Sequence, residues 1–320
     1  MKTVVVLGAG QIGTAVAEML SGANYFVDLA DQKFSEKAKQ LLNRTTVTGH
    51  EAPSLHTEMG VKQVFEKAKK PRAVISCLPH ECNKAIAKVA VDMGMHYFDL
   101  TEDVETSEYI QSISKGADSA FVPQCGLAPG FISIAANDIM KRFDAVSKVK
   151  LRVGSLPAHP NNKLKYNLMW STNGLINECG NTCHGIKEGE LVDLEPMENL
   201  ETISINGVEY EAFNTSGGIG TLLDTWKGKV KYLTYKTLRY PGHCDLFKFL
   251  LDDLSLNSQR DTLEAILEHA IPRTKDDLVI IYISVTGTVG DETYERNYVR
   301  KIYPLNGYPN EGMTAIQLTT

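Results

Sequence analysis

The residues with the most specific chemistry in this sequence are three glycines in the pattern Gly8-Ala9-Gly10-Gln11-Ile12-Gly13. The pattern follows a hydrophobic run that predicts a strand and precedes an amphipathic stretch that predicts a helix. In this setting Gly8 permits a tight turn, Gly10 lets the backbone approach a pyrophosphate, and Gly13 lets the helix pack on the strand. Asp31 ends the next predicted strand, where a carboxylate binds ribose hydroxyls and repels a 2′-phosphate. The sequence therefore predicts NAD as the cofactor in preference to NADP.

Ionisable side chains follow the later predicted strands of the first half of the chain. Ligands of a parallel α/β sheet bind at the carboxyl ends of its strands, so the loops Cys77–His80, Asp99–Glu102 and Pro123–Gly126 should converge near the nicotinamide. Asp99 and Cys125 are the candidates there for moving a proton. The other residues expected to contact the cofactor, beside the three glycines and Asp31, are Gln11, Ile12, Cys77, Leu78, Pro79 and Leu100.

The second half of the chain carries a separate candidate group in Arg239-Tyr240-Pro241-Gly242-His243. Arginine commonly binds a carboxylate through two parallel hydrogen bonds, and a histidine at the start of a helix can act as an acid or a base. A surface ion pair for Arg239 with a capping role for its neighbours is the alternative. The glycine-rich run Ser216–Gly220 predicts either a close backbone approach to a substrate or a turn.

A cluster of possible metal ligands occurs at Cys179, Cys183 and His184. Structural zinc sites usually show two paired sets of ligands, and the sequence has no second set near this one. Six cysteines in 320 residues also do not resemble a disulfide framework. We therefore expect no bound metal.

The elements that must position these residues alternate between strands and helices in the first half. Strands are predicted at Thr3–Leu7, Phe26–Ala30, Arg44–Thr48, Ala73–Ser76, His96–Asp99 and Ala120–Val122, and helices at Thr14–Ser21, Lys37–Asn43 and Asn83–Met93. Such alternation predicts a Rossmann-type doubly wound α/β fold built on a parallel sheet.

The pattern changes after about residue 144 and predicts a second, α+β domain on a mainly antiparallel sheet. Asn206-Gly207 between two strand-like runs is typical of a two-residue hairpin turn. A second hairpin is predicted around Gly287–Glu292, and helices at His243–Leu254 and Asp261–His269. We expect a NAD-binding domain at residues 1–145, to which the segment 310–320 returns, and a substrate-binding and dimerisation domain at residues 146–309.

Composition restricts the function further. The 320 residues suffice for about two domains, and a net charge of −6 without a Lys/Arg cluster argues against binding nucleic acid or an anionic membrane. The apolar run near Met1 is short and stops at Gly8, so we expect no signal peptide, and the sequence has no apolar run of the roughly 20 residues that a membrane helix needs. These features predict a cytoplasmic protein with a small-molecule substrate.

Three longer motifs resemble the saccharopine dehydrogenase superfamily, and within it the lysine 6-dehydrogenases. They are Cys125-Gly126-Leu127-Ala128-Pro129-Gly130, Glu211–Gly218 and Tyr235–His243. Glutamate-forming saccharopine dehydrogenases usually carry aspartate where Ala128 stands and tend to lack a histidine at position 243. The resemblance implies NAD-dependent oxidation of the ε-amine of L-lysine to allysine, which cyclises to the piperideine carboxylate, with release of ammonia. It also implies a homodimer or a higher homo-oligomer.

This resemblance assigns provisional roles to the candidate residues. Asp99 or His243 would remove the ammonium proton, Cys125 would shuttle a proton or pack beneath the nicotinamide, and Arg239 would hold the α-carboxylate. The remaining predicted substrate contacts are Tyr166, Asn173, Glu211, Thr215 and Ser216, of which Glu211 could equally be structural. The alternatives are a saccharopine dehydrogenase or related amine dehydrogenase, and a non-catalytic NAD-binding sensor.

Overall fold

The computed structural model describes residues 2–305 and 312–320 and divides into two compact units. The first unit comprises residues up to Pro129 together with Thr320, and the second comprises Gly130–Thr319. The division therefore falls before the predicted boundary at residues 145/146. Of the predicted returning segment 310–320, only Thr320 groups with the first unit, and residues 310 and 311 lie outside the described residues.

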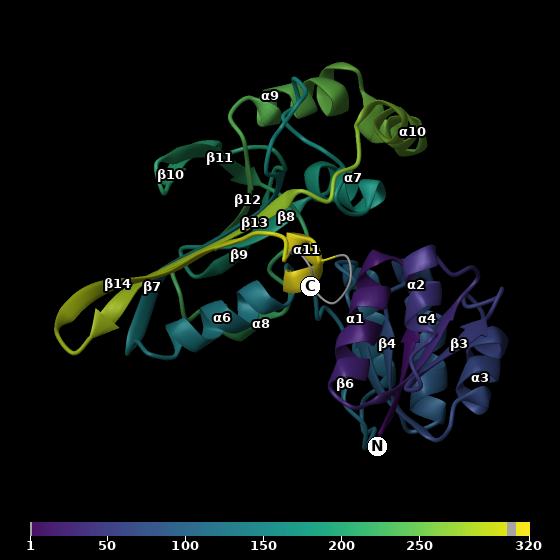
Figure 1. The fold of residues 1–320 in the computed structure, drawn as a ribbon. Helices are drawn as coiled ribbons and strands as arrows, with labels where there is room; N and C mark the ends of the chain where they lie inside the picture. Colours follow the sequence, from purple (N-terminus) through teal and green to yellow (C-terminus); the bar gives the residue numbers. More distant parts are fainter. Residues whose placement is uncertain (1, 306–311) are drawn as a thin grey trace. The chain divides into compact units, whose positions relative to one another are not determined.

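The first unit contains a parallel sheet of six described strands in the order β3-β2-β1-β4-β5-β6 (Figure 1). Its strands are β1 Thr3–Leu7, β2 Phe26–Asp31, β3 Val47–Glu51, β4 Pro71–Ser76, β5 His96–Asp99 and β6 Phe121–Val122. Its helices are α1 Gln11–Gly22, α2 Glu36–Leu41, α3 Glu58–Lys67, α4 His80–Asp92 and α5 Val104–Ile113. The predicted doubly wound fold is confirmed. The third strand begins later than predicted because residues 44–46 close a turn after α2, in which Arg44 N donates to Leu41 O.

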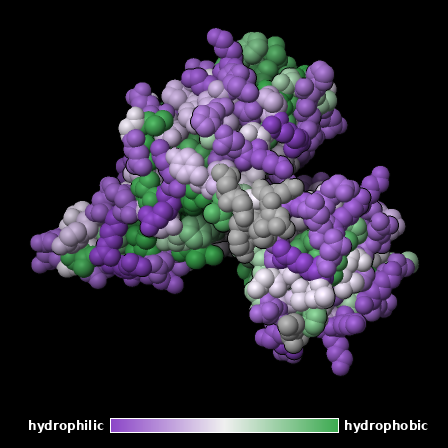
Figure 2. Space-filling model, viewed as in Figure 1, coloured by the Kyte–Doolittle hydropathy of each residue, from purple (hydrophilic) through white to green (hydrophobic). Residues whose placement is uncertain are grey.

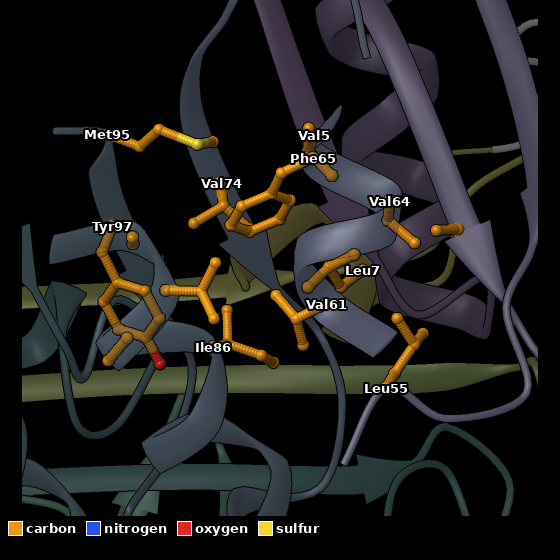
Figure 3. Close-up of a cluster of buried hydrophobic side chains, with 14 of the residues drawn as sticks. Val5, Leu7, Leu55, Val61, Val64, Phe65, Val74, Ile86, Met95 and Tyr97 are labelled. Carbon is orange, nitrogen blue, oxygen red and sulfur yellow. The ribbon is translucent and has the colours of Figure 1, made fainter. Parts of the chain in front are cut away.

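A hydrophobic cluster holds this sheet against its helices (Figure 3). Val5 and Leu7 of β1 and Val74 of β4 pack against Phe65 of α3 and Ile86 of α4. All five side chains are fully or almost fully buried. Because each such burial contributes about 1.5–3 kcal/mol, this packing fixes the strand ends on which the candidate site depends.

The second unit is built on a mixed sheet in the order β10-β11-β12-β7-β13-β14, to which β8 and β9 attach through β12 (Figure 1). Its strands are β7 Ala145–Pro157, β8 Cys183–Lys187, β9 Glu190–Leu194, β10 Glu201–Ile205, β11 Val208–Asn214, β12 Tyr232–Arg239, β13 Asp277–Val289 and β14 Glu292–Ile302. Its helices are α6 Phe131–Met140, α7 Thr172–Gly180, α8 Leu222–Trp226, α9 His243–Lys248, η1 Phe249–Asp253, η2 Leu256–Ser258, α10 Arg260–Ala270 and α11 Ala315–Thr319. The mainly antiparallel pairing matches the prediction, since β12 and β7 form the one parallel pair among the described strands of this sheet.

Both predicted hairpins are present, and the second differs in its turn. Asn206 and Gly207 have φ values of 53° and 78°, as expected for their two-residue turn. In the other hairpin β13 continues to Val289, so most of the predicted loop Gly287–Glu292 is strand. A Cβ on Gly287 would lie 2.3 Å from the Ala145 carbonyl oxygen, so this glycine serves the close approach of β7 rather than a turn.

The surface of the second unit carries exposed apolar side chains on α6. Ile134 is 70% exposed, and Phe131 is partly exposed beside Tyr298 of β14. Figure 2 shows hydrophobic residues gathered over this part of the unit. In the described part of the chain, no helix is long and apolar enough to cross a lipid bilayer.

Candidate functional site

The glycine turn lies between β1 and α1, as predicted. Gly8 has φ +97°, a left-handed value that glycine adopts without strain. A Cβ on Gly13 would lie 1.8 Å from the Gly8 carbonyl oxygen, so only glycine permits this packing of helix on turn. A Cβ on Gly10 would meet nothing within 4 Å, and Gly10, the N-cap residue of α1, makes no side-chain cap. The open N-terminus of α1, lined by backbone N–H groups, fits a pyrophosphate.

Asp31 lies at the end of β2 and is tied to this turn. The Ala9 amide donates to Asp31 Oδ2 at 2.5 Å, and the Gln32 amide donates to Oδ1 at 2.6 Å. The carboxylate is only half-buried. Its place at the end of the strand next to β1 fits the binding of adenosine ribose hydroxyls.

The other residues predicted to contact the cofactor also lie at the carboxyl edge of this sheet. β1 pairs with β2 on one side and with β4 on the other, which makes the edge between β1 and β4 the topological switch point. Gln11 and Ile12 begin α1, Leu100 follows β5, and the loop Cys77–Pro79 joins β4 to α4. Burial raises the pKa of the Cys77 thiol to about 12, so this side chain is neutral at physiological pH.

Asp99 is fully buried at the end of β5 and is surrounded by hydrogen-bond donors. Tyr97 Oη donates to Oδ2 at 2.6 Å, and the amides of Thr101 and Gln124 donate to Oδ1, each at 3.0 Å. Burial raises the pKa of the carboxyl above its ordinary value, while these three donors oppose the rise. Because both oxygens already accept hydrogen bonds, the geometry suits a group that holds the loops after β5 and β6 better than a proton acceptor.

Cys125 lies on one of the loops that Asp99 holds. The Cys125 amide donates to the Asp99 carbonyl oxygen at 2.7 Å, and the preceding residue, Gln124, has φ +63°. The thiol is half-buried and donates to the Val122 carbonyl oxygen at 3.1 Å. Burial and the charge of Asp99 raise its pKa to about 11. Cys125 is therefore a neutral thiol at physiological pH.

Arg239 is buried in the second unit beside a carboxylate that sequence reasoning missed. Its Nη2 donates to Glu178 Oε2 at 3.1 Å, and Thr237 Oγ1 donates to Glu178 Oε1 at 2.7 Å. The guanidinium lies over the Tyr166 ring, with its carbon 5.1 Å from the ring centroid. Arg239 is 1% exposed, so the predicted alternative of a surface ion pair does not describe it. Its Nε hydrogen has no acceptor among the described residues.

A sequence signal for Glu178 does exist. On α7 it lies three residues beyond the buried Leu175, and therefore on the side of the helix that faces the core. A carboxylate at such a position requires a buried partner.

His243 is fully buried at the start of α9, next to Arg239. Its Nδ1 lies 3.0 Å from the Leu164 carbonyl oxygen, and because a carbonyl only accepts, Nδ1 must carry the proton. Nε2 then carries a lone pair and has no partner in the described part of the chain. Burial, followed by the charge of Arg239, lowers the pKa of His243 to about 3. The imidazole is therefore neutral at physiological pH and a poor base.

Thr215 and Ser216, the predicted substrate contacts beside the glycine-rich run, differ in whether their side chains already have partners. Thr215 is buried, and its Oγ1 has no partner among the residues described. Ser216 instead donates through its amide to the Glu178 carbonyl oxygen and through Oγ to the Asn177 carbonyl oxygen, both at 2.9 Å. A Cβ on Gly218 would lie 2.1 Å from the buried Tyr235 ring, so the close approach of this backbone is to a side chain of the protein.

Two other predicted substrate contacts are engaged elsewhere. Glu211 accepts from the amides of Gly242 and Cys244, at 2.8 and 2.5 Å, and thus caps α9. This is the structural role that the sequence left open. Asn173 lies on the exposed side of α7, where its Oδ1 accepts from Asn177 Nδ2. Tyr166 is buried, and its hydroxyl accepts from Trp170 Nε1 at 2.9 Å.

The possible metal ligands do not form a site. Cys179 and Cys183 are buried, whereas His184 is exposed and pairs through Nδ1 with Asp193 at 2.9 Å. Successive residues of β8 point to opposite faces, so Cys183 and His184 cannot share an ion. In the described ranges, no three His, Cys, Asp or Glu side chains form a group that could hold a metal.

Comparison with known families identifies both units. Residues 4–120 match the model described as the saccharopine dehydrogenase NADP binding domain, and residues 126–320 match the saccharopine dehydrogenase C-terminal domain. The second match alone covers more than half of the chain. The chain belongs to the saccharopine dehydrogenase family. The predicted superfamily is therefore confirmed.

Curated relatives and solved structures agree with this family. Alpha-aminoadipic semialdehyde synthase of Rattus norvegicus is 23% identical over 317 residues, which cover 89% of this chain and 31% of the relative. The Mus musculus protein of the same name is 22% identical over 263 residues, 73% of this chain and 27% of the relative. The chain thus spans about a third of the length of these curated relatives.

Two solved structures share the fold. Saccharopine dehydrogenase (L-Glu forming) of Saccharomyces cerevisiae has a TM-score of 0.79 and 16% identity, and the match covers 100% of this chain and 88% of that one. Homospermidine synthase of Legionella pneumophila, in complex with NAD, has a TM-score of 0.59 and 13% identity, with coverages of 94% and 78%. A nicotinamide cofactor is supported by the family of the first unit.

Proposed function

We propose that this member of the family catalyses NAD-dependent oxidation of the ε-amine of L-lysine. The product imine is hydrolysed by water to allysine and ammonia, and allysine cyclises to the piperideine carboxylate. The first unit would hold the nicotinamide cofactor, which supplies a hydride acceptor when bound. The second unit would hold the amino acid.

The observation that carries this proposal is the buried Arg239 with its unpartnered Nε hydrogen. A carboxylate can approach the side of a guanidinium and accept from Nε and from the second hydrogen of Nη2. The other fully buried arginine of the second unit, Arg152, already donates through Nε to Glu201 at 2.6 Å. Saccharopine adds a glutamate moiety, which needs a further cationic group. One available buried guanidinium therefore supports an amino acid with a single carboxylate, such as lysine.

We infer NAD in preference to NADP from Asp31. A 2′-phosphate beside this half-buried carboxylate would place two negative charges close together. Ribose hydroxyls can instead donate to the carboxylate.

Asp99 and Cys125 are proposed to position the reacting groups rather than to remove the substrate proton. Asp99 would hold the loop that carries Cys125, and the neutral thiol would pack near the nicotinamide. With His243 also neutral, the substrate amine would lose its proton to water before it binds.

We further infer a cytoplasmic homo-oligomer that acts on a small molecule, without nucleic acid or membrane partners. The exposed Phe131 and Ile134 on α6 support a protein–protein contact. Sedimentation velocity of the wild-type protein and of an Ile134→Glu variant tests this. An oligomer that is present in the wild type and lost in the variant would place α6 in the interface.

The proposed reaction is tested by following NADH at 340 nm with purified protein and L-lysine, saccharopine and L-ornithine, each with NAD and with NADP. We expect reduction with lysine and NAD, together with one ammonia per NADH. Reduction with saccharopine and release of glutamate would instead assign the sister activity. Retained NAD binding without any turnover would favour the non-catalytic sensor.

The pH profile of lysine oxidation should rise toward the alkaline range. The pKa values of His243, about 3, and Cys125, about 11, leave both groups neutral between pH 6 and 9. A lysine ε-amine has a pKa near 10.4, so its neutral fraction increases about tenfold per pH unit below that value. We expect log kcat/KM to rise with a slope close to one from about pH 7 to pH 9. A plateau that begins near pH 7 would instead reveal a protein base.

A further inference from the structure

Arg239 and His243 carry two unpartnered atoms of opposite chemical type in the second unit. Arg239 Nε is a donor on a cation, and His243 Nε2 is an acceptor on a neutral ring. Both residues are at most 1% exposed, and the charge of Arg239 acts on the His243 ring. Within the described residues neither atom finds a partner, although buried polar atoms are nearly always hydrogen-bonded. A ligand that supplies one acceptor and one donor would satisfy both.

The surrounding segment fixes the direction of the His243 lone pair. The Leu164 carbonyl accepts from Nδ1, and the next residue, Lys165, has φ +51° and donates through Nζ to the Pro241 carbonyl oxygen at 2.9 Å. The imidazole is stacked between Phe247 and Phe213, with interplanar angles of 13° and 11°. A 180° flip of the ring would put Cδ2 in place of Nδ1 and lose the bond to Leu164, so this bond fixes the direction of Nε2.

The charges of the site favour a ligand without net charge. Arg239 and Glu178 form a 1:1 ion pair, and His243 is neutral. A carboxylate alone would leave the buried site with one uncompensated negative charge, which is costly in a low dielectric. A carboxylate with an adjacent ammonium adds no net charge.

We propose that His243 Nε2 accepts a hydrogen bond from the α-ammonium of the amino acid whose carboxylate Arg239 binds. This inference rests on the proposed function and deepens it, because it makes the free α-amino group a requirement of the site. His243 is then a specificity-determining residue and takes no part in proton transfer. The site selects α-amino acids over carboxylic acids and over simple amines.

The test uses ligands that cannot be oxidised at an ε-amine. L-Norleucine has the complete α-amino acid group, and hexanoate lacks only the ammonium. We expect the NAD-loaded protein to bind norleucine about tenfold to a hundredfold more tightly than hexanoate, as for one charge-assisted hydrogen bond of about 1.5–3 kcal/mol. In the His243→Phe variant this ratio should fall about tenfold, because phenylalanine retains the ring stack and lacks the acceptor. Titration calorimetry measures both affinities.

Phe247→Leu is the matched control, since it disturbs the stack and keeps Nε2. Equal loss of the preference in Phe247→Leu would show a packing effect and overturn the proposal. So would an unchanged ratio in His243→Phe, or a wild-type protein that binds norleucine no better than hexanoate. If His243→Phe does not fold, the ¹⁵N shift of His243 Nε2 in the wild-type protein decides. It should move on addition of norleucine and not of hexanoate, and any other response contradicts the proposal.

These results separate the inference from the proposed function. If the protein discriminates norleucine from hexanoate but does not oxidise lysine, the inferred ammonium contact stands and the proposed lysine reaction is wrong. If lysine is oxidised, His243→Phe should raise KM for lysine at least tenfold and change KM for 6-aminohexanoate little. An equal rise for both substrates would contradict the role of His243.

Discussion

Glu178→Ala should lower the free energy of unfolding of the second unit by about 3–5 kcal/mol, because it leaves the fully buried Arg239 without its counter-charge. The pair lies between α7 and β12, and Thr237 also donates to the lost carboxylate. Both tryptophans of the chain, Trp170 and Trp226, belong to this unit. Urea unfolding followed by tryptophan fluorescence therefore measures the affected unit.

A double variant separates charge burial from loss of packing. Glu178→Met combined with Arg239→Met replaces the ion pair by apolar groups of similar volume and should recover most of the lost stability, since such replacements are often neutral. It should not recover amino-acid binding. Glu190→Ala, which removes an exposed partner of Lys227, is the matched control and should change stability little. A loss below about 1 kcal/mol in Glu178→Ala would show that water or another group compensates Arg239.

The sequence was sufficient for the architecture because local chemistry and global fold agree there. The glycine turn, the β-branched strand runs and the Asn206-Gly207 hairpin each have one common structural solution, and each occurs, with only the third strand shifted toward later residues. Gly287 shows the limit of such reasoning. A glycine between two predicted strands suggests a turn. Here Gly287 lies within β13 and permits the close approach of β7, a strand more than 130 residues earlier in the sequence.

The roles of the candidate site residues were harder to predict from the sequence, because most of these roles depend on partners that are distant in sequence. Asp99 was a candidate to accept a proton, but Oδ2 accepts from Tyr97, and Oδ1 accepts from Thr101 and from Gln124, which lies on a different loop. Glu178 was missed because its partner Arg239 lies 61 residues away. The burial that lowers the pKa of His243 is likewise a property of the assembled core. Residue type alone therefore indicated which side chains could do chemistry, but not which partners each of them has in the fold.

Gly10→Ala should weaken NADH binding about tenfold to a hundredfold while the thermal unfolding temperature stays unchanged. A Cβ at this position meets nothing in the protein within 4 Å, and Gly10 has φ −72°, which alanine adopts without strain. The added methyl would instead occupy the approach of the pyrophosphate to the backbone, at a cost of about 1–3 kcal/mol for overpacking. Fluorescence titration with NADH and a thermal melt measure the two effects separately.

Two neighbouring glycines make this prediction specific to the cofactor. Gly22→Ala, at the other end of α1, also places its Cβ in open space and should leave both affinity and stability as they are. Gly13→Ala should lower both, because its Cβ would lie 1.8 Å from the Gly8 carbonyl oxygen and must move the helix from the strand. Wild-type NADH affinity in Gly10→Ala, with the fold intact, would mean that no phosphate approaches this turn. The glycines would then serve only the packing of α1 on β1.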